Sequence, residues 1–404
     1  MDKREKRVQI AEKWIFYFMC GFALFSSVSM AGGNLFLSLG LVASFVRLYY
    51  KHDDVTTILH KNKTLTYLFV AMIGAICVSF SVSEHPIHSI RVFGDFYGYR
   101  MCGFYIVMLF VRAREKLLRL FGLAAASSVI NGIYCLWQSI ALGSTRADGF
   151  YFYMTTGAFL SMWTPLALLF VLAAFEKGKY RAVSVFVLIF MIAVQFCNQT
   201  RGAWVAVAVT SLVLVLMYMR SKKKAITVLI SLIMAVGLVF ACVPQLNHRL
   251  LSITDVKSGG DRFFLWTSSY HMFIDHPILG IGFNEFKDKY QTQYILPEAK
   301  ERRLVHAHSN VMQMLAEGGV LGITTWSAFW GYTIWMGLYG WKKEHNIVYL
   351  AWFAVVAGMH LHGLTEYTQG NSAVTKEFWF LLGILLQLIW LCEKDRKLTV
   401  NGHQ

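Results

Sequence analysis

The sequence predicts an all-helical protein that crosses a membrane many times. Hydrophobic residues make up 56% of the chain and charged residues only 15%, whereas soluble domains carry about a quarter charged residues. Apolar stretches of roughly 17–25 residues recur, and each could cross a bilayer core of about 30 Å. Because these stretches do not alternate apolar and polar residues as strands do, we expect helices.

We expect twelve spans in a single integral membrane domain that covers residues 1–404. The spans lie at about 14–32, 33–50, 65–82, 96–111, 118–141, 150–174, 181–198, 202–219, 225–243, 307–341, 347–363 and 373–392. The tenth is too long for one crossing, so we expect a short helix at the membrane face before the chain enters the lipid. The largest hydrophilic insert, residues 244–305, separates the ninth span from the tenth.

Positive charge sets the expected orientation. Five Lys and Arg residues precede the first span, which indicates a cytoplasmic N-terminus. With alternating spans, 25 of the 38 Lys and Arg residues lie in cytoplasmic segments, both termini are cytoplasmic, and residues 244–305 lie outside. The net charge of +15 then reflects topology and anionic membrane lipids. Basic residues scattered over separate span ends are not a nucleic-acid footprint.

The seven cysteines indicate neither a disulfide framework nor a metal site. All lie in or beside apolar spans without a CxxC pair, as expected of small core residues. They are Cys20, Cys77, Cys102, Cys135, Cys197, Cys242 and Cys392.

Arginine should be scarce in short outer segments, so Arg201 in "CNQTRGAW" is informative. The connection between its spans is tight, and Gly202 permits a close approach of another group. These features favour a binding residue. The alternative is an interface arginine whose side chain extends to lipid headgroups.

Three further arginines lie in segments that we expect outside. Arg262 follows two glycines in "SGGDRFFLW" and could bind a ligand or pair with Asp261. Arg91 and Arg100 flank Asp95, and we interpret this group as a structural ion pair.

The stretch "HSNVMQMLAEGGVLG" places polar residues before the tenth span. Asn310 is expected to cap a helix with Gln313 as its capping-box partner, and Gln313 and Glu317 share a face. His308 then precedes a helix N-terminus, whose dipole favours the neutral imidazole that a general base needs. The alternative for His308 is a packed or capping residue. His306 is a weaker candidate that we expect to face elsewhere.

These stretches resemble the O-antigen ligase and polymerase superfamily of integral membrane glycosyltransferases. "GGDRFFLWTSSYHMFIDHPILGIGFNEF" resembles its outer-loop pattern of Arg, Trp four residues later, Pro-x-x-Gly-x-Gly and an aromatic residue. "HSNVMQMLAEGGVLG" resembles its His-x-x-x-x-Gln-x-x-x-Glu-x-Gly-x-x-Gly signature, and "TRG" matches a third feature. Ser309 stands where an Asn is common in the superfamily. This departure puts the expected geometry of the helix cap in doubt. The resemblance covers about the second half of the chain.

The resemblance implies a GT-C-like glycosyltransferase of the bacterial inner membrane that needs no metal and no cofactor. Its partners would be a glycan on undecaprenyl pyrophosphate and a hydroxyl of lipid A–core oligosaccharide, which meet at the periplasmic face. Arg201 and Arg262 would bind the pyrophosphate through planar, bidentate guanidinium groups. His308 would take the acceptor proton in an inverting displacement. Supporting residues would be His306, Asn310, Gln313 and Glu317.

Several functions remain open on this basis. The single large outer insert favours an O-antigen ligase over an O-antigen polymerase, which tends to carry two. A protein O-oligosaccharyltransferase of the same superfamily often has additional soluble mass at its C-terminus. A transporter of lipid-linked glycans is less expected, since transporters more often show internal repeats and ionisable residues near mid-membrane.

Overall fold

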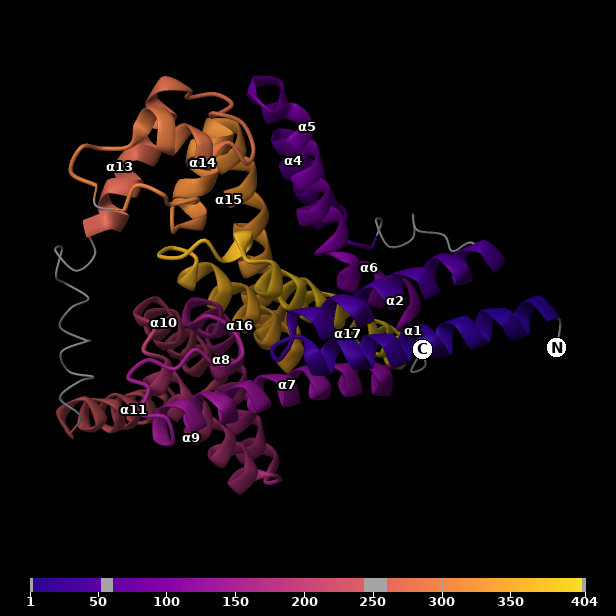
Figure 1. Cartoon of the computed structure of the whole chain (residues 1–404). Coiled ribbons are helices and arrows are strands. Elements are labelled where there is room, and N and C mark those ends of the chain that lie inside the picture. Colours follow the sequence, from indigo (N-terminus) through magenta and orange to yellow (C-terminus); the bar gives the residue numbers. More distant parts are fainter. Residues whose placement is uncertain (1–2, 52–60, 243–259, 300, 402–404) are drawn as a thin grey trace.

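The computed structural model describes residues 3–51, 61–242, 260–299 and 301–401, and the regular elements in these ranges are helices (Figure 1). Eight helical segments there are long and apolar enough to cross a membrane. This is the predicted fold class, an all-helical chain suited to crossing a membrane several times. The count of twelve crossings and the outer position of residues 244–305 stay predictions, and residues 243–259 lie outside the described ranges.

Each expected span overlaps at least one α-helix in the described part of the chain. These helices are α1 (Lys3–Phe25), α2 (Met30–Tyr50), α4 (Lys63–Ser79), α6 (Cys102–Phe110), α7 (Arg114–Ile140), α8 (Tyr153–Lys177), α9 (Arg181–Asn198), α10 (Arg201–Tyr218), α11 (Lys222–Cys242), α15 (Asn310–Glu344), α16 (Ile347–His362) and α17 (Ser372–Asn401). Local sequence sets several ends. Side chains of Ser29, Asn62 and Asn346 cap the starts of α2, α4 and α16, and Gly178 ends α8 in the left-handed conformation.

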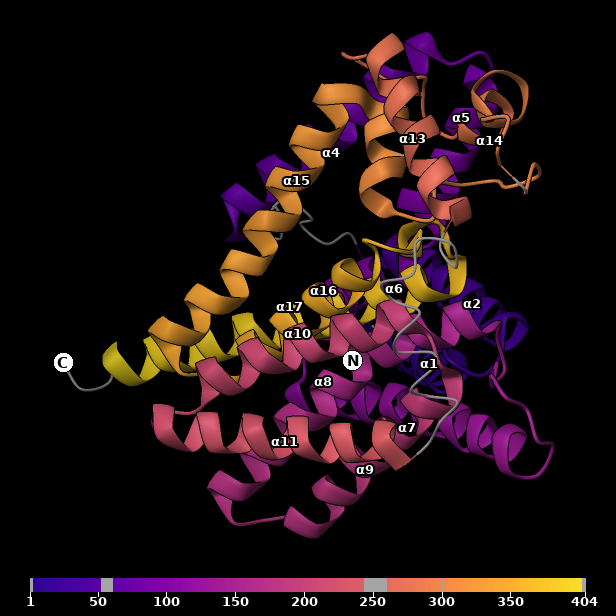
Figure 2. The same ribbon diagram turned by 90° about the vertical axis from the view of Figure 1, so that its left-hand side faces the viewer.

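Shorter helical elements form the connections. They are η1 (Phe80–Val82), α5 (Pro86–Phe93), η2 (Gly94–Tyr99), α13 (Gly260–Asp275), α14 (Phe286–Lys289), η4 (Tyr290–Tyr294) and η5 (Thr368–Gly370). Both views show α13, α14 and the beginning of α15 grouped at one end of the molecule, above the bundle that contains α8, α10, α16 and α17 (Figures 1 and 2). Helix α4 packs along α15. The connection between α16 and α17 lies where the bundle meets this upper group.

The centre of the bundle is formed by α8, α16 and α17. Of the candidate spans, α8 and α17 are the most buried, and α16 packs against both. Glu377 of α17 is fully buried, and its carboxylate accepts hydrogen bonds from Trp163 Nε1 and Ser27 Oγ, each 2.6 Å long. A buried carboxylate without such partners would be costly, so these bonds fix how α1, α8 and α17 pack. The α16–α17 connection is therefore held at both ends by helices that pack in the centre of the bundle.

The fourth expected span, residues 96–111, is not one helix. The π-helix η2 precedes α6, which runs only from Cys102 to Phe110 and at 1.5 Å per residue covers about 14 Å. Arg100 N–H donates to the carbonyl of Asp95, the five-residue spacing of a π-helix, and the two side chains form a 2.6 Å ion pair. Hydropathy alone did not reveal this break. The Arg100–Asp95 ion pair confirms our interpretation for these two residues.

The tenth expected span is broken near its start, as its length suggested. Gly319 inside α15 has φ 58° and ψ −155°, a conformation that only glycine adopts without strain. Residues 310–318 therefore form a short helix of their own, and residues 320–344 form the long one. The break separates the polar beginning of α15 from its apolar remainder.

A backbone loop before α14 fills this break. Val320 N–H donates to Pro277 O at 2.8 Å, and Ile281 N–H donates to Ala316 O at 2.9 Å. A Cβ on Gly280 would lie 2.4 Å from the backbone of α15, so only glycine fits there. The Pro-x-x-Gly-x-Gly stretch of the sequence thus supplies partners for the backbone groups that the break exposes.

Candidate active site

Ser309, and not Asn310, caps the short first helix of α15. Ser309 has extended backbone angles, and its Oγ accepts a hydrogen bond from the N–H of Met312. The expected cap at Asn310 was wrong because this buried side chain faces the α16–α17 connection. There Asn310 donates to Thr368 Oγ1 at 2.8 Å and accepts from Gln369 N–H at 3.1 Å. Asn310 therefore holds the connection against the start of α15.

Gln313 and Glu317 share a helix face, as predicted, and their side chains are hydrogen-bonded. Gln313 Nε2 donates to Glu317 Oε1 at 2.9 Å, and Gln313 Oε1 accepts from the N–H of Ala307 at 2.8 Å. Glu317 Oε1 also accepts from the N–H of Phe286 at 3.2 Å. These two buried residues therefore fix the turn before α15 and the start of α14.

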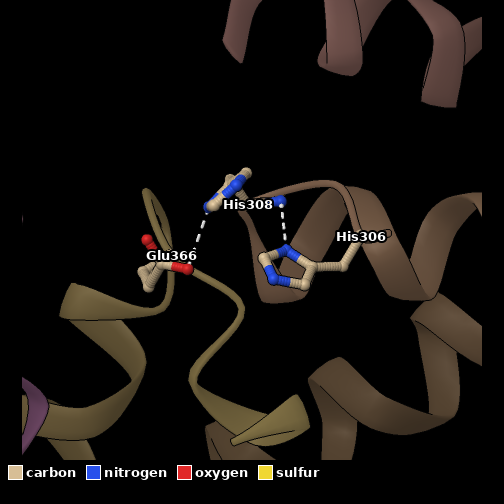
Figure 3. Close-up of side chains that lie close together, drawn as sticks. All are labelled: His306, His308 and Glu366. Carbon is tan, nitrogen blue, oxygen red and sulfur yellow. Dashed lines mark hydrogen bonds and ion pairs between the residues drawn. The ribbon is translucent and has the colours of Figure 1, made fainter. Parts of the chain in front are cut away.

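Three side chains from distant parts of the sequence meet beside this turn. His308 Nδ1 lies 2.9 Å from Glu366 Oε1 (Figure 3), and Arg262 Nη2 lies 3.3 Å from Glu366 Oε2. Arg262 comes from the first turn of α13 and Glu366 from the α16–α17 connection. Both ends of one carboxylate are thus used. The Asp261 side chain, considered as a partner of Arg262, lies outside the described residues.

His306 joins the same cluster, so the expectation that it faces elsewhere was wrong. The rings of His306 and His308 have centroids 4.3 Å apart, and the His308 N–H donates to His306 Nδ1 at 3.3 Å (Figure 3). His308 has a φ of 47°, and this left-handed turn brings the two side chains together. Burial, followed by the charge of His308, lowers the pKa of His306 to about 4.

The electrostatic setting of Glu366 differs from that of an isolated buried acid. Burial alone would raise the pKa of its carboxyl group. The hydrogen bond to His308 and the positive charges of His308 and Arg262 outweigh burial and hold that pKa at about 2. Glu366 is therefore an ionised acceptor at neutral pH.

Arg201 is the first residue of α10, and this end of α10 lies against the connection that carries Glu366. A Cβ on Gly202 would lie 2.3 Å from Thr365 Oγ1 and 3.0 Å from His362 Cδ2. The prediction that Gly202 permits a close approach is thus confirmed. The structure brings the start of α10 to the residue that precedes Glu366.

A cavity of about 670 Å³ extends from the cluster toward α5 and α14. Its wall includes His306 and Glu366. Among the described residues that line it, Arg201, Arg262 and His308 do not occur. Glu366 thus contributes to the cavity wall while its carboxylate binds two residues outside that wall.

The region that carries the two arginines and His308 also matches a known family model. The model is described as O-antigen ligase, and the match covers residues 186–327. Residues 186–327 are thus similar to the O-antigen ligase family. A search of curated proteins found no match.

Glu366 lies outside the part that matches the O-antigen ligase family, and the sequence analysis did not identify it. It is separated from His308 by 58 residues, so no local motif connects them. One signal was present, because Glu366 is the only charged residue in the short expected outer segment "LTEYTQGNS". An acidic residue alone between two spans is a reasonable candidate for a site.

The cluster of His306, His308 and Glu366 also has the composition of a metal site. Ligand atoms of His306, His308 and Glu366 all lie within 4.8 Å of one another. Two imidazoles and a carboxylate are ligands that Zn²⁺ accepts. The same side chains can therefore act in proton transfer or as metal ligands, and only the first role leaves activity in the presence of a chelator.

Proposed function

We propose that the protein is an O-antigen ligase. It transfers a glycan from undecaprenyl pyrophosphate to a sugar hydroxyl of lipid A–core oligosaccharide at the periplasmic face of the inner membrane. The contact of Glu366 with both His308 and Arg262 carries this proposal, since it joins a general base to a cation that can bind phosphate. The family match supports a role in glycan transfer.

His308 acts as the general base in the proposed reaction. Its Nδ1–H donates to Glu366, which leaves the lone pair of Nε2 for the acceptor hydroxyl. As the proton moves to Nε2, the acceptor oxygen bonds to the anomeric carbon of the donor, and the bond from that carbon to the pyrophosphate breaks. This direct displacement inverts the anomeric configuration. Ionised Glu366 orients the ring and stabilises the imidazolium that forms.

Arg201 and Arg262 bind the leaving pyrophosphate. Guanidinium groups match phosphate oxygens through paired, charge-assisted hydrogen bonds, and these strengthen as charge develops on the leaving oxygen. The ion pair with Glu366 positions Arg262 beside the base. The two arginines supply the positive charge that a divalent cation provides in other phosphate-transfer sites, so the reaction needs neither metal nor cofactor.

The topology proposed for this enzyme has twelve crossings in one domain, both termini in the cytoplasm and residues 244–305 in the periplasm. The distribution of basic residues supports this orientation. The described part of the insert, α13 and α14, packs with the short first helix of α15, so the proposed orientation puts the whole cluster at the periplasmic face.

Deletion of the gene and electrophoresis of the lipopolysaccharide test the reaction. Loss of a ligase removes all O-antigen bands and accumulates lipid-linked polymer, whereas loss of a polymerase leaves core with one repeat unit. A protein O-oligosaccharyltransferase would instead lose glycan from protein. The wild-type gene on a plasmid should restore the bands, and the His308→Ala gene should not. An unchanged ladder would contradict both the ligase and the polymerase.

A further inference from the structure

The cavity beside the cluster is large enough for a short oligosaccharide. Its volume of about 670 Å³ falls within the roughly 300–1,000 Å³ of typical small-molecule sites. α5 and α14 contribute one side, and the α16–α17 connection contributes another. His306, in ring contact with His308, forms part of the wall next to the base. A ligand in the cavity therefore lies one side chain away from the proposed base.

Among the described residues, the cavity wall carries both signs of charge, with three cations (Arg91, Arg100 and Lys287) and four acids (Asp95, Asp288, Glu317 and Glu366). Arg100 is paired with Asp95, and Glu366 is bound by residues outside the wall. The exposed side chains of Arg91 and Lys287 have no hydrogen bond or ion pair within the described part of the chain.

Two of the four acids, Glu317 and Asp288, make no ion pair in the described part of the chain. Glu317 is engaged by Gln313 and the backbone of Phe286, so Asp288 is the remaining acid beside the two cations. The exposed imidazole of His88, also on the wall, adds a hydrogen-bonding group. Arg91 and Lys287 are thus the lining cations that are free to bind an anionic group of a ligand, within the described part of the chain.

Other lining groups are suited to sugar hydroxyls. Asn284 and Thr155 offer amide and hydroxyl groups, and Phe96 and Tyr367 offer aromatic surface. Hydroxyl-rich rings bind through such hydrogen bonds together with contact of their C–H faces on aromatic rings. Together with Arg91 and Lys287, these groups suit the binding of a glycan that bears a phosphate or a carboxylate.

We propose that this cavity binds the acceptor glycan through an anionic substituent held by Arg91 and Lys287. The inference rests on the proposed function. Displacement at the anomeric carbon requires the acceptor and the leaving group on opposite sides of that carbon. Arg262, assigned to the leaving group, lies outside the cavity wall, whereas the acceptor hydroxyl can approach His308 past His306. The expected ion pair of Arg91 with Asp95 does not form among the described residues, where Asp95 pairs with Arg100, so Arg91 is available for this role.

The double variant Arg91→Gln/Lys287→Gln tests the assignment in purified full-length protein. Transfer is measured with lipid A–core acceptor that is intact, treated with phosphatase, or chemically reduced at its carboxylates. Loss of two charge-assisted contacts should raise the acceptor KM by about tenfold or more, with donor KM unchanged. Only the treatment that removes the recognised phosphate or carboxylate should raise the acceptor KM of the wild-type protein. With that treated acceptor, the wild type and the double variant should have the same acceptor KM.

Arg302→Gln/Arg303→Gln is the matched control. Both arginines are exposed and do not line the cavity, and they belong to the same insert, residues 244–305, as Lys287. Every KM should therefore stay at the wild-type value. If the two double variants raise the acceptor KM equally, the effect comes from general surface charge, and the assignment is overturned. A rise in donor KM with unchanged acceptor KM would place the donor in the cavity and would also overturn it.

Calorimetry with glucose 6-phosphate separates this proposal from the proposed function. Wild-type protein should bind the probe at least tenfold more tightly than the Arg91→Gln/Lys287→Gln variant, even if no transfer is detected with a lipid-linked donor. Absence of transfer with normal probe binding would contradict the ligase reaction alone. If both proteins bind glucose 6-phosphate and glucuronate equally, the anionic cavity is disproved.

Discussion

At the scale of single residues, the site depends on one carboxylate that is shared. Glu366 accepts from His308 with one oxygen and from Arg262 with the other, so base and cation are coupled through it. A change at Glu366 removes a partner from both His308 and Arg262, and a change at either of these two removes a partner from Glu366. Substitutions in this cluster should therefore be compared with a neighbour that belongs to the site but has a different role, and His306 is such a neighbour.

His308→Ala should nearly abolish transfer, with a loss of roughly 10²–10⁴-fold in rate, because a general base is removed. His306→Ala should cost much less, because His306 contacts His308 through its ring and through the backbone N–H of His308, and its loss leaves the base in place. Initial rates with purified proteins check this, and equal membrane levels of both variants control for misfolding. Equal losses, or a loss in His306→Ala alone, would contradict the assignment of the base.

Glu366→Gln should lower transfer by as much as roughly 10⁴-fold, because a neutral amide neither fixes the imidazole tautomer nor stabilises the imidazolium. The substitution should also change stability with pH. The folded-state pKa of about 2 lies below the usual 4.5, so the carboxylate stabilises the fold above pH 4.5 and loses this effect toward pH 2. The difference in Tm between the two proteins in detergent should shrink over that range. A constant difference would argue against the ion-pair cluster.

Arg201→Lys and Arg262→Lys should each lose roughly tenfold or more in transfer, because lysine keeps the charge but not the planar fork. A contact with headgroups or an exposed ion pair predicts tolerance, since such pairs contribute about 0–1 kcal/mol. Kinetics of both variants check this.

Purified wild-type protein should keep its activity in EDTA, because the arginines supply the charge at the leaving group. Activity after exhaustive chelation is measured, with a denatured sample as the blank. Loss of activity that Mg²⁺ or Zn²⁺ restores would assign His306, His308 and Glu366 as metal ligands instead.

At the scale of elements, hydropathy located the helices well because apolar length alone decides where a chain can cross lipid. The excess length of the tenth span also indicated a break there. Hydropathy failed at residues 96–111, where an ion pair at π-helical spacing interrupts the helix. The cap at Ser309 and the position of Glu366 depend on packing between segments far apart in the sequence. No local pattern encodes these contacts.

Gly319→Ala should destabilise the protein and reduce transfer. Its φ of 58° disfavours a side chain by about 1–3 kcal/mol, and the added Cβ would lie 2.6 Å from the backbone of Ile278. Gly331→Ala in the same helix is the control, since its Cβ meets nothing within 4 Å. Thermal unfolding and transfer rates compare the two. If Gly319→Ala matches Gly331→Ala in both, the break in α15 is not required for the site.

At the scale of the whole molecule, the site lies where two groups of helices meet. The central bundle supplies the α16–α17 connection, and the upper group supplies α13 and the start of α15 (Figures 1 and 2). The proposed orientation turns this junction toward the periplasm. The orientation is predicted from the distribution of basic residues. It can be tested by chemical labelling from one side of the membrane, without an assay of activity.

Arg302→Cys should react with an impermeant thiol reagent in intact spheroplasts, and Ser221→Cys should react only after lysis. Both residues are exposed, and the orientation places them on opposite sides of the membrane. The exposed native Cys77 and Cys242 are first replaced by serine so that they do not contribute. Labelling of Ser221→Cys in intact spheroplasts, with protection of Arg302→Cys, would invert the topology.

The position of Glu366 in the chain also determines when the cluster can form during synthesis. The ribosome makes Arg262 first, then His308, and Glu366 last, 58 residues after His308. Until the connection after α16 emerges, His308 and Arg262 lack the carboxylate that they share, and Asn310 has no partner in that connection. A nascent chain stalled before Glu366 therefore lacks the cluster, so we expect transfer activity only after the connection between α16 and α17 has been made.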